Sequence, residues 1–113
     1  MNREGKRCVM YSRVSTEMQV EGYSLEGQIT RMKSFADREE MIIVKKYEDA
    51  GKSGKSIAGR PAFQNMLDDI KGGEQIDYIL VYKLSRFGRN AADILNSLEL
   101  IQDYGVNLIS VEE

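Results

Sequence analysis

The chain has 113 residues, of which 42% are hydrophobic and 30% are charged, with a formal net charge of −2. This length is typical of one domain. No apolar run approaches the roughly 20 residues that span a bilayer, so we expect a soluble, cytoplasmic protein without a membrane segment. The sequence has no histidine, and its single cysteine, Cys8, suits a buried position in an apolar run. This composition excludes an internal disulfide, Ser-His and Cys-His nucleophile pairs, and nearly every zinc site.

The first half of the chain predicts a strand, a helix and a second strand. The apolar run 7–12 is short, as a buried strand should be. Ser24 follows a polar stretch and suits a helix N-cap. Apolar side chains at helical spacing then predict a helix from Leu25 to about Glu40. The run 41–47 predicts the second strand.

The second half repeats this alternation after a long polar loop. Residues 48–60 contain three glycines and no apolar periodicity, which indicates a loop. Pro61 favours the start of a helix that ends near Gly72, and the run 78–82 is the clearest buried strand. The remaining predicted elements are a polar loop at 83–89, a helix capped by Asn90, and a strand at 106–111.

The order of these elements is β-α-β-α-β-α-β. With right-handed crossovers, it predicts an α/β fold: a three-layer α/β/α sandwich around a mostly parallel sheet of at least four strands. Ligands of such sheets bind beyond the carboxyl ends of the strands. The segments that belong there are 13–23, 49–60 and 83–90, and none of them has an apolar pattern. They are therefore the predicted functional site.

These loops supply a hydroxyl and several cations. Arg13 and Ser15 share a face if their segment is extended, and Arg86 and Arg89 share a face if theirs makes a helical turn. Arg60 belongs to the second loop. Guanidinium groups stay charged and match phosphate oxygens with paired hydrogen bonds. A serine among arginines therefore predicts nucleophilic attack on a phosphodiester, with the arginines stabilising the added negative charge.

Three segments resemble the motifs of the serine recombinases, the resolvase and invertase family. YSRVST at 11–16, followed by Gln19, is similar to the opening motif, and GRPAF at 59–63 and KLSRFGRN at 83–90 are similar to two later ones. The resemblance covers the whole chain and implies that Ser15 is the nucleophile, which becomes joined to a DNA 5′-phosphate. It also implies that four arginines act on this phosphate, namely Arg13, Arg60, Arg86 and Arg89.

One stretch indicates a branch of this family, and one position departs from its pattern. EGYSLEGQ at 21–28 resembles the large serine recombinases, such as phage integrases and transposon recombinases. Many family members have aspartate where this chain has Ser85, which cannot orient Arg86 by charge or carry a proton as a carboxylate would. Tyr11 also suits simple packing at a strand end. The residues expected to support the site are Tyr11, Gln19, Gln28, Ser53 and Ser85.

The resemblance implies double-stranded DNA as substrate, with no cofactor and no metal. It implies a homodimer and a synaptic homotetramer that break, exchange and rejoin both strands without an external energy source. It further implies that residues 1–113 are the N-terminal catalytic domain of a longer protein, whose dimerisation helix and DNA-binding region lie outside this sequence. The proton acceptor of Ser15 stays open, because the chain lacks histidine and arginine is a poor base.

Parts of the sequence also suggest three other functions. A flavodoxin-like nucleotide-binding module is suggested by GKSGKS at 51–56, but Lys46 and Asp49 stand where a P-loop requires its first glycine. A metal-dependent nuclease needs clustered carboxylates, and in these loops only Glu48 and Asp49 form a plausible pair. The third alternative is a recombinase-like assembly domain whose chemistry is weakened at Ser85.

Overall fold

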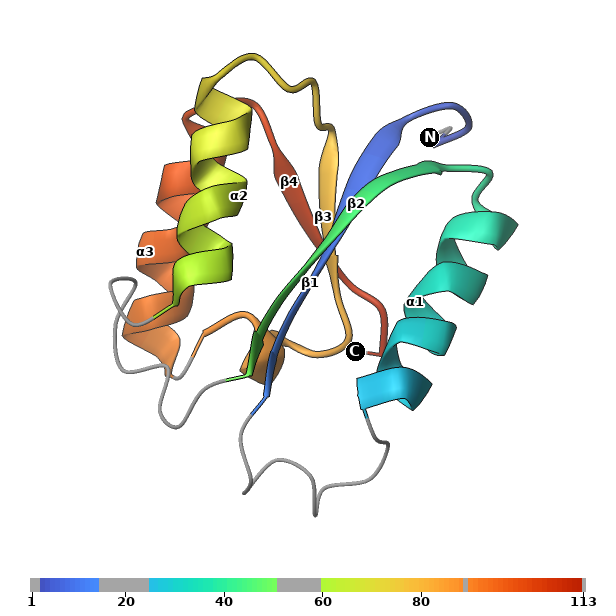
Figure 1. The fold of residues 1–113 in the computed structure, drawn as a ribbon, viewed down its shortest axis with the longest axis horizontal. Helices are drawn as coiled ribbons and strands as arrows, with labels where there is room; N and C mark the ends of the chain where they lie inside the picture. Colours follow the sequence, from blue (N-terminus) through green and yellow to red (C-terminus); the bar gives the residue numbers. More distant parts are fainter. Residues whose placement is uncertain (1–2, 15–24, 51–59, 89, 113) are drawn as a thin grey trace.

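A computed structural model of the chain describes residues 3–14, 25–50, 60–88 and 90–112. Strands and helices alternate along these residues (Figure 1). In the described part of the chain, no helix is both long enough and apolar enough to cross a bilayer. The strands are β1 (Arg7–Val14), β2 (Ile42–Ala50), β3 (Tyr78–Val81) and β4 (Asn107–Ser110), and the helices are α1 (Leu25–Arg38), α2 (Pro61–Lys71) and α3 (Ala91–Gln102), with a short 3-10 helix, η3 (Leu84–Arg86), after β3.

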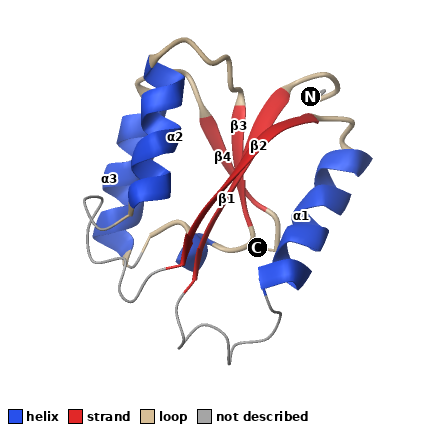
Figure 2. Ribbon diagram, viewed as in Figure 1, coloured by secondary structure: helices blue, strands red, loops and turns tan. Residues whose placement is uncertain are grey.

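The strands form one parallel sheet in the order β2-β1-β3-β4. Helix α1 covers one face of the sheet, and α2 and α3 cover the other (Figure 2). The predicted three-layer α/β/α sandwich and its element order are confirmed. From β1 the chain runs outward to β2 and then crosses to β3 on the other side, so the strand order reverses between β1 and β3. Open parallel sheets bind ligands at the carboxyl ends of strands at such a point.

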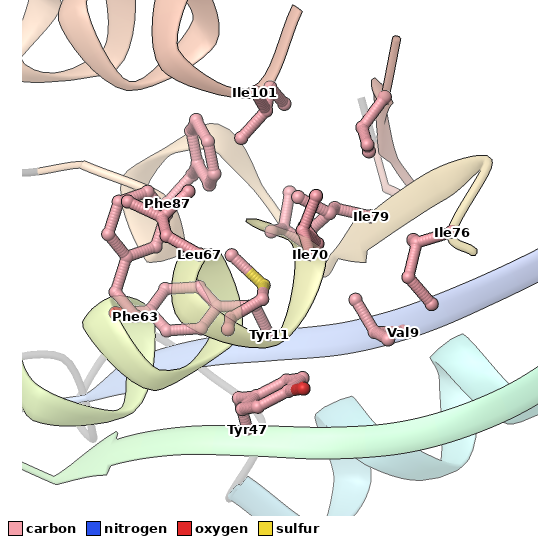
Figure 3. Packing of buried hydrophobic residues seen from close by; sticks show 13 residues of the cluster. Val9, Tyr11, Tyr47, Phe63, Leu67, Ile70, Ile76, Ile79, Phe87 and Ile101 are labelled. Carbon is pink, nitrogen blue, oxygen red and sulfur yellow. The ribbon is translucent and has the colours of Figure 1, made fainter. Parts of the chain in front are cut away.

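Successive residues of β1 face opposite helix layers, as the pleat of a strand requires. Cys8 and Met10 pack on the α1 side, and burial raises the pKa of the Cys8 thiol to about 11, as expected for a buried hydrophobe. Tyr11 packs on the α2 and α3 side against Phe63 and Phe87 (Figure 3). The ring centroids lie 5.4 Å apart for Tyr11 and Phe63 and 5.7 Å apart for Phe63 and Phe87, both edge to face. This aromatic cluster lies next to the carboxyl end of β1.

The boundary between β2 and the following loop differs from the prediction. β2 continues to Ala50, so Glu48 and Asp49 belong to the strand and not to the loop. β1 also continues to Val14, and Arg13 on β1 is the register partner of Asp49 on β2. The predicted ends of the strands were wrong because they were placed where the apolar residues stop. Backbone pairing between β1 and β2 continues both strands through the polar residues that follow. The other element boundaries agree within two residues.

Candidate active site at the carboxyl ends of β1 and β3

The predicted site residues fall into two groups. Those that the structure describes come from four different segments of the chain and are Tyr11, Arg13, Gln28, Arg60, Ser85 and Arg86. Those that lie outside the described residues are Ser15, Gln19, Ser53 and Arg89. The described residues contact one another and further side chains nearby.

Arg13 extends from the end of β1 to the segment that follows β3. It is 4% exposed, and its Nη2 donates to the carbonyl oxygens of Ser85 at 2.8 Å and Gly88 at 3.4 Å. Burial lowers the pKa of Arg13, and the positive charges of Arg60 and Arg86 lower it further. The structure therefore brings three of the predicted arginines within electrostatic reach of one another.

Arg60 immediately precedes α2, and its guanidinium lies among aromatic rings. It is 1% exposed, with Cζ at 4.2 Å from the centroid of the Phe63 ring and 5.2 Å from that of Tyr11. Its Nε donates to the Tyr11 hydroxyl at 3.0 Å, and its Nη2 donates to the carbonyl oxygen of Phe87. Among the described residues, no ion pair includes Arg60. A buried cation held in this way favours binding of an anion, because burial of an unpaired charge is costly.

Asp49 connects Arg60 to the first turn of α2. It is 5% exposed; Oδ2 accepts hydrogen bonds from the Tyr11 hydroxyl at 2.7 Å and from the Phe63 N–H at 3.1 Å. Oδ1 accepts from the Ala62 N–H at 2.8 Å. Arg60 occupies the N-cap position of α2 but makes no capping hydrogen bond with its side chain. Asp49 thus supplies, from a neighbouring strand, the acceptors that the first amides of a helix need.

The Tyr11 hydroxyl links this carboxylate to the arginine. It donates to Asp49 and accepts from Arg60. Burial raises the pKa of Tyr11 above its usual value, and this outweighs the opposing effect of Arg60, so the hydroxyl stays protonated and donates. Tyr11 therefore packs in the core and also contacts Arg60 through its hydroxyl, whereas its support of catalysis stays a prediction.

Asp49 is the residue that sequence reasoning missed as a part of this network. Its oxygens accept from three donors, which argues against the metal role considered for it with Glu48. In the described ranges, no group of three or more acidic or cysteine side chains is placed to hold a metal ion. One sequence signal was available: a helix that begins at Pro61 after a residue other than Ser, Thr, Asp or Asn needs its acceptor from elsewhere.

Arg86 lies in η3 and is held from the side of α1. It is 2% exposed, and its Nε donates to Gln28 Oε1 at 3.3 Å. Ser12 Oγ donates to the same Gln28 oxygen at 3.4 Å. Arg86 Nη1 donates to Ser85 Oγ at 3.2 Å, so the serine contacts the arginine through a neutral hydrogen bond. Gln28 is among the residues expected to support the site, whereas Ser12, although it lies in the motif at 11–16, is not.

Replacing Asp49 with alanine is expected to lower the free energy of unfolding by about 3 kcal/mol. Three buried or partly buried donors lose their acceptor, and each such loss typically costs about 1–3 kcal/mol where water cannot replace it. Urea denaturation followed by circular dichroism measures this change. The matched control is Asp37→Ala on the exposed side of α1, expected within about 0.5 kcal/mol of the parent. Equal effects of the two substitutions would contradict the bridging role.

Comparisons with known proteins agree with this fold. The model of the resolvase N-terminal domain family matches residues 8–113. A resolvase family site-specific recombinase from Streptococcus pneumoniae is 58% identical, with a TM-score of 0.80 over 95% of this chain and 72% of that one. The N-terminal catalytic domain of TP901-1 integrase is 33% identical, with a TM-score of 0.81 over 94% of this chain and 77% of that one.

Two further similarities are weaker. The C-terminal catalytic domain of ISC1926 TnpA, an IS607-like serine recombinase, is 24% identical, with a TM-score of 0.76 over 93% of this chain and 70% of that one, which supports the fold alone. An uncharacterized immunity region protein 3 of Bacillus phage phi105 is 41% identical over 69 residues, covering 60% of this chain and 83% of that protein. Because the family model covers almost the whole sequence, the chain belongs to the resolvase N-terminal domain family of serine recombinases.

Proposed function

We propose that residues 1–113 form the catalytic domain of a site-specific DNA recombinase and that Ser15 is its nucleophile. Ser15 Oγ attacks a phosphorus of the DNA backbone, and a new Oγ–P bond forms as the bond from phosphorus to the 3′ oxygen breaks. The Ser15 hydroxyl loses its proton and the 3′ oxygen takes one up, and the DNA 5′-phosphate stays esterified to the protein. After strand exchange, a 3′ hydroxyl attacks this ester and restores both the DNA and the serine.

The observation that carries this proposal is the group of buried guanidiniums at the carboxyl ends of β1 and β3. Arg13, Arg60 and Arg86 are each at most 4% exposed. Among the described residues, neither Arg13 nor Arg60 takes part in an ion pair. A DNA phosphate would supply the missing negative charge. Ser15 directly follows the last residue of β1, the strand that carries Arg13.

Each of the four arginines then has a proposed role in the reaction. As the phosphorus acquires a fifth oxygen, negative charge increases, and each fixed donor typically stabilises this state by about 3 kcal/mol. Arg13, Arg60, Arg86 and Arg89 are the proposed donors. The residues that hold or support them are Tyr11, Gln28, Asp49 and Ser85, and Gln19 and Ser53 remain predictions.

The proposed reaction needs no cofactor and no metal. The energy of the phosphodiester bond is kept in the seryl ester, so rejoining requires no external energy source. Double-stranded DNA is the proposed substrate, and family membership supports a homodimer and a synaptic homotetramer as the assemblies that act on it.

The test of this proposal is to trap the protein on a suicide DNA substrate, in which a nick prevents rejoining. Mass spectrometry of the digested complex should find a nucleotide mass on the peptide that contains Ser15. An adduct on a different residue would overturn the assignment of the nucleophile. Cleavage without any protein adduct would instead indicate hydrolysis by water, as in a metal-dependent nuclease.

A recombinase-like assembly domain with weakened chemistry is the second candidate, because Ser85 replaces the aspartate of many relatives. Ser85 is exposed and already contacts Arg86, whose Nε is also held by Gln28. Because Arg86 already has hydrogen bonds to Gln28 and Ser85, we expect Ser85→Asp to change the single-turnover cleavage rate only slightly. A much larger gain would favour the weakened enzyme. Segment 51–56, which suggested a nucleotide-binding module, lies outside the described residues.

A further inference from the structure

One nitrogen of Arg13 has no partner in the hydrogen-bond network of the site. Nη2 donates to the carbonyl oxygens of Ser85 and Gly88, whereas Nε is buried and makes no hydrogen bond in the described part of the molecule. A buried donor without an acceptor typically costs about 1–3 kcal/mol. A group kept at this cost in a cluster of functional side chains calls for a physical explanation.

A carboxylate oxygen in the same region is also buried without a partner. Asp93 lies in the first turn of α3, and its backbone N–H donates to the capping Asn90 side chain at 2.9 Å. Its Oδ2 is buried and accepts no hydrogen bond from the described residues. The first turn of a helix favours a negative charge. The cap and the helix therefore fix the backbone from which this carboxylate extends.

Gly88 brings the two groups together. Its carbonyl oxygen accepts from Arg13. A β-carbon at Gly88 would lie 3.2 Å from Asp93 Cβ and 2.8 Å from Ile94 Cγ1, so only glycine allows this close approach of the loop to α3. Arg13 and Asp93 thus both lie close to Gly88. The pKa of Arg13 is lowered by burial and by the charges of Arg60 and Arg86, and the negative charge of Asp93 opposes this lowering.

We propose that Asp93 is a positioning residue for Arg13, whose carboxylate supplies the counter-charge of the buried guanidinium and directs it toward the DNA phosphate. Among the described residues, Arg13 makes no ion pair, so its buried charge has no carboxylate in direct contact. The effect on DNA cleavage rests on the proposed function, whereas the pairing of the two charges does not.

The pairing is tested in the 113-residue chain by NMR. Exchange of the Arg13 Nε–H with water is catalysed by hydroxide, which a nearby carboxylate repels. Asp93→Asn, which removes the charge and keeps the shape, should speed this exchange several-fold, and Asp93→Glu should restore much of the protection. Asp103→Asn, at the opposite end of α3, is the matched control and should leave the rate unchanged. Equal exchange rates in the parent and Asp93→Asn would overturn the pairing.

The positioning role is tested by a double-mutant cycle on single-turnover DNA cleavage at saturating DNA. Asp93→Asn alone should slow cleavage roughly tenfold to a hundredfold with unchanged DNA affinity, because small misplacements of a catalytic group have effects of this size. In an Arg13→Ala background, the same substitution should have almost no further effect. Additive losses would overturn the proposal, since a general structural defect adds to the loss of Arg13. If the parent protein forms no seryl adduct, the proposed function fails, while the exchange measurement still decides the pairing.

Discussion

Ser15→Ala is expected to abolish the covalent complex between protein and DNA. A methyl group cannot form a phosphate ester, and the chain has no histidine that could activate water as a substitute nucleophile. The measurement is the yield of protein–DNA adduct on a denaturing gel, with a suicide substrate at saturating concentration. DNA binding, measured separately, should be nearly unchanged, because the arginines proposed to contact phosphate remain.

The matched control is Ser12→Ala, which removes a hydroxyl from the same strand. Ser12 donates to Gln28, which also accepts from Arg86, so this variant should form the adduct more slowly without losing it. Adduct formation by Ser15→Ala at a rate similar to that of Ser12→Ala would remove Ser15 from the nucleophile role.

Arg13→Ala is expected to lower the single-turnover cleavage rate about a hundredfold or more. The substitution removes one of the positively charged hydrogen-bond donors proposed to stabilise the pentavalent phosphorus. It also removes the hydrogen bonds from this side chain on β1 to the carbonyl oxygens of Ser85 and Gly88. Arg13→Lys should recover only part of the rate, because an ammonium keeps the charge but lacks the planar fork of donors.

Two measurements separate catalysis from docking for Arg13. DNA affinity of Arg13→Ala should fall far less than the cleavage rate, and circular dichroism should show an intact fold. Arg38→Ala, at the last turn of α1 and therefore at the opposite edge of the sheet, removes the same charge and should alter neither quantity. A parallel loss of affinity and rate in Arg13→Ala would make Arg13 a docking contact.

Sequence by itself determined the order of the elements, the parallel sandwich and the cationic character of the site. Apolar periodicity is a local property, and the run 78–82 or the cap at Asn90 can be recognised from a few neighbouring residues. The edge of the sheet to which Arg13, Arg60 and Arg86 belong then follows from the handedness of the crossovers.

Only the tertiary structure decided which side chains hold the arginines. Tyr11 and Asp49 are 38 residues apart, and Arg13 lies 72 residues from the carbonyl of Ser85 that it binds. Contacts over such separations depend on strand register and helix placement, which no short motif encodes. Asp49 and Asp93 resemble ordinary acidic residues in the sequence. Only the folded chain shows that Asp49 binds the Tyr11 hydroxyl, which in turn contacts Arg60, and only the fold gives a reason to propose a role for Asp93.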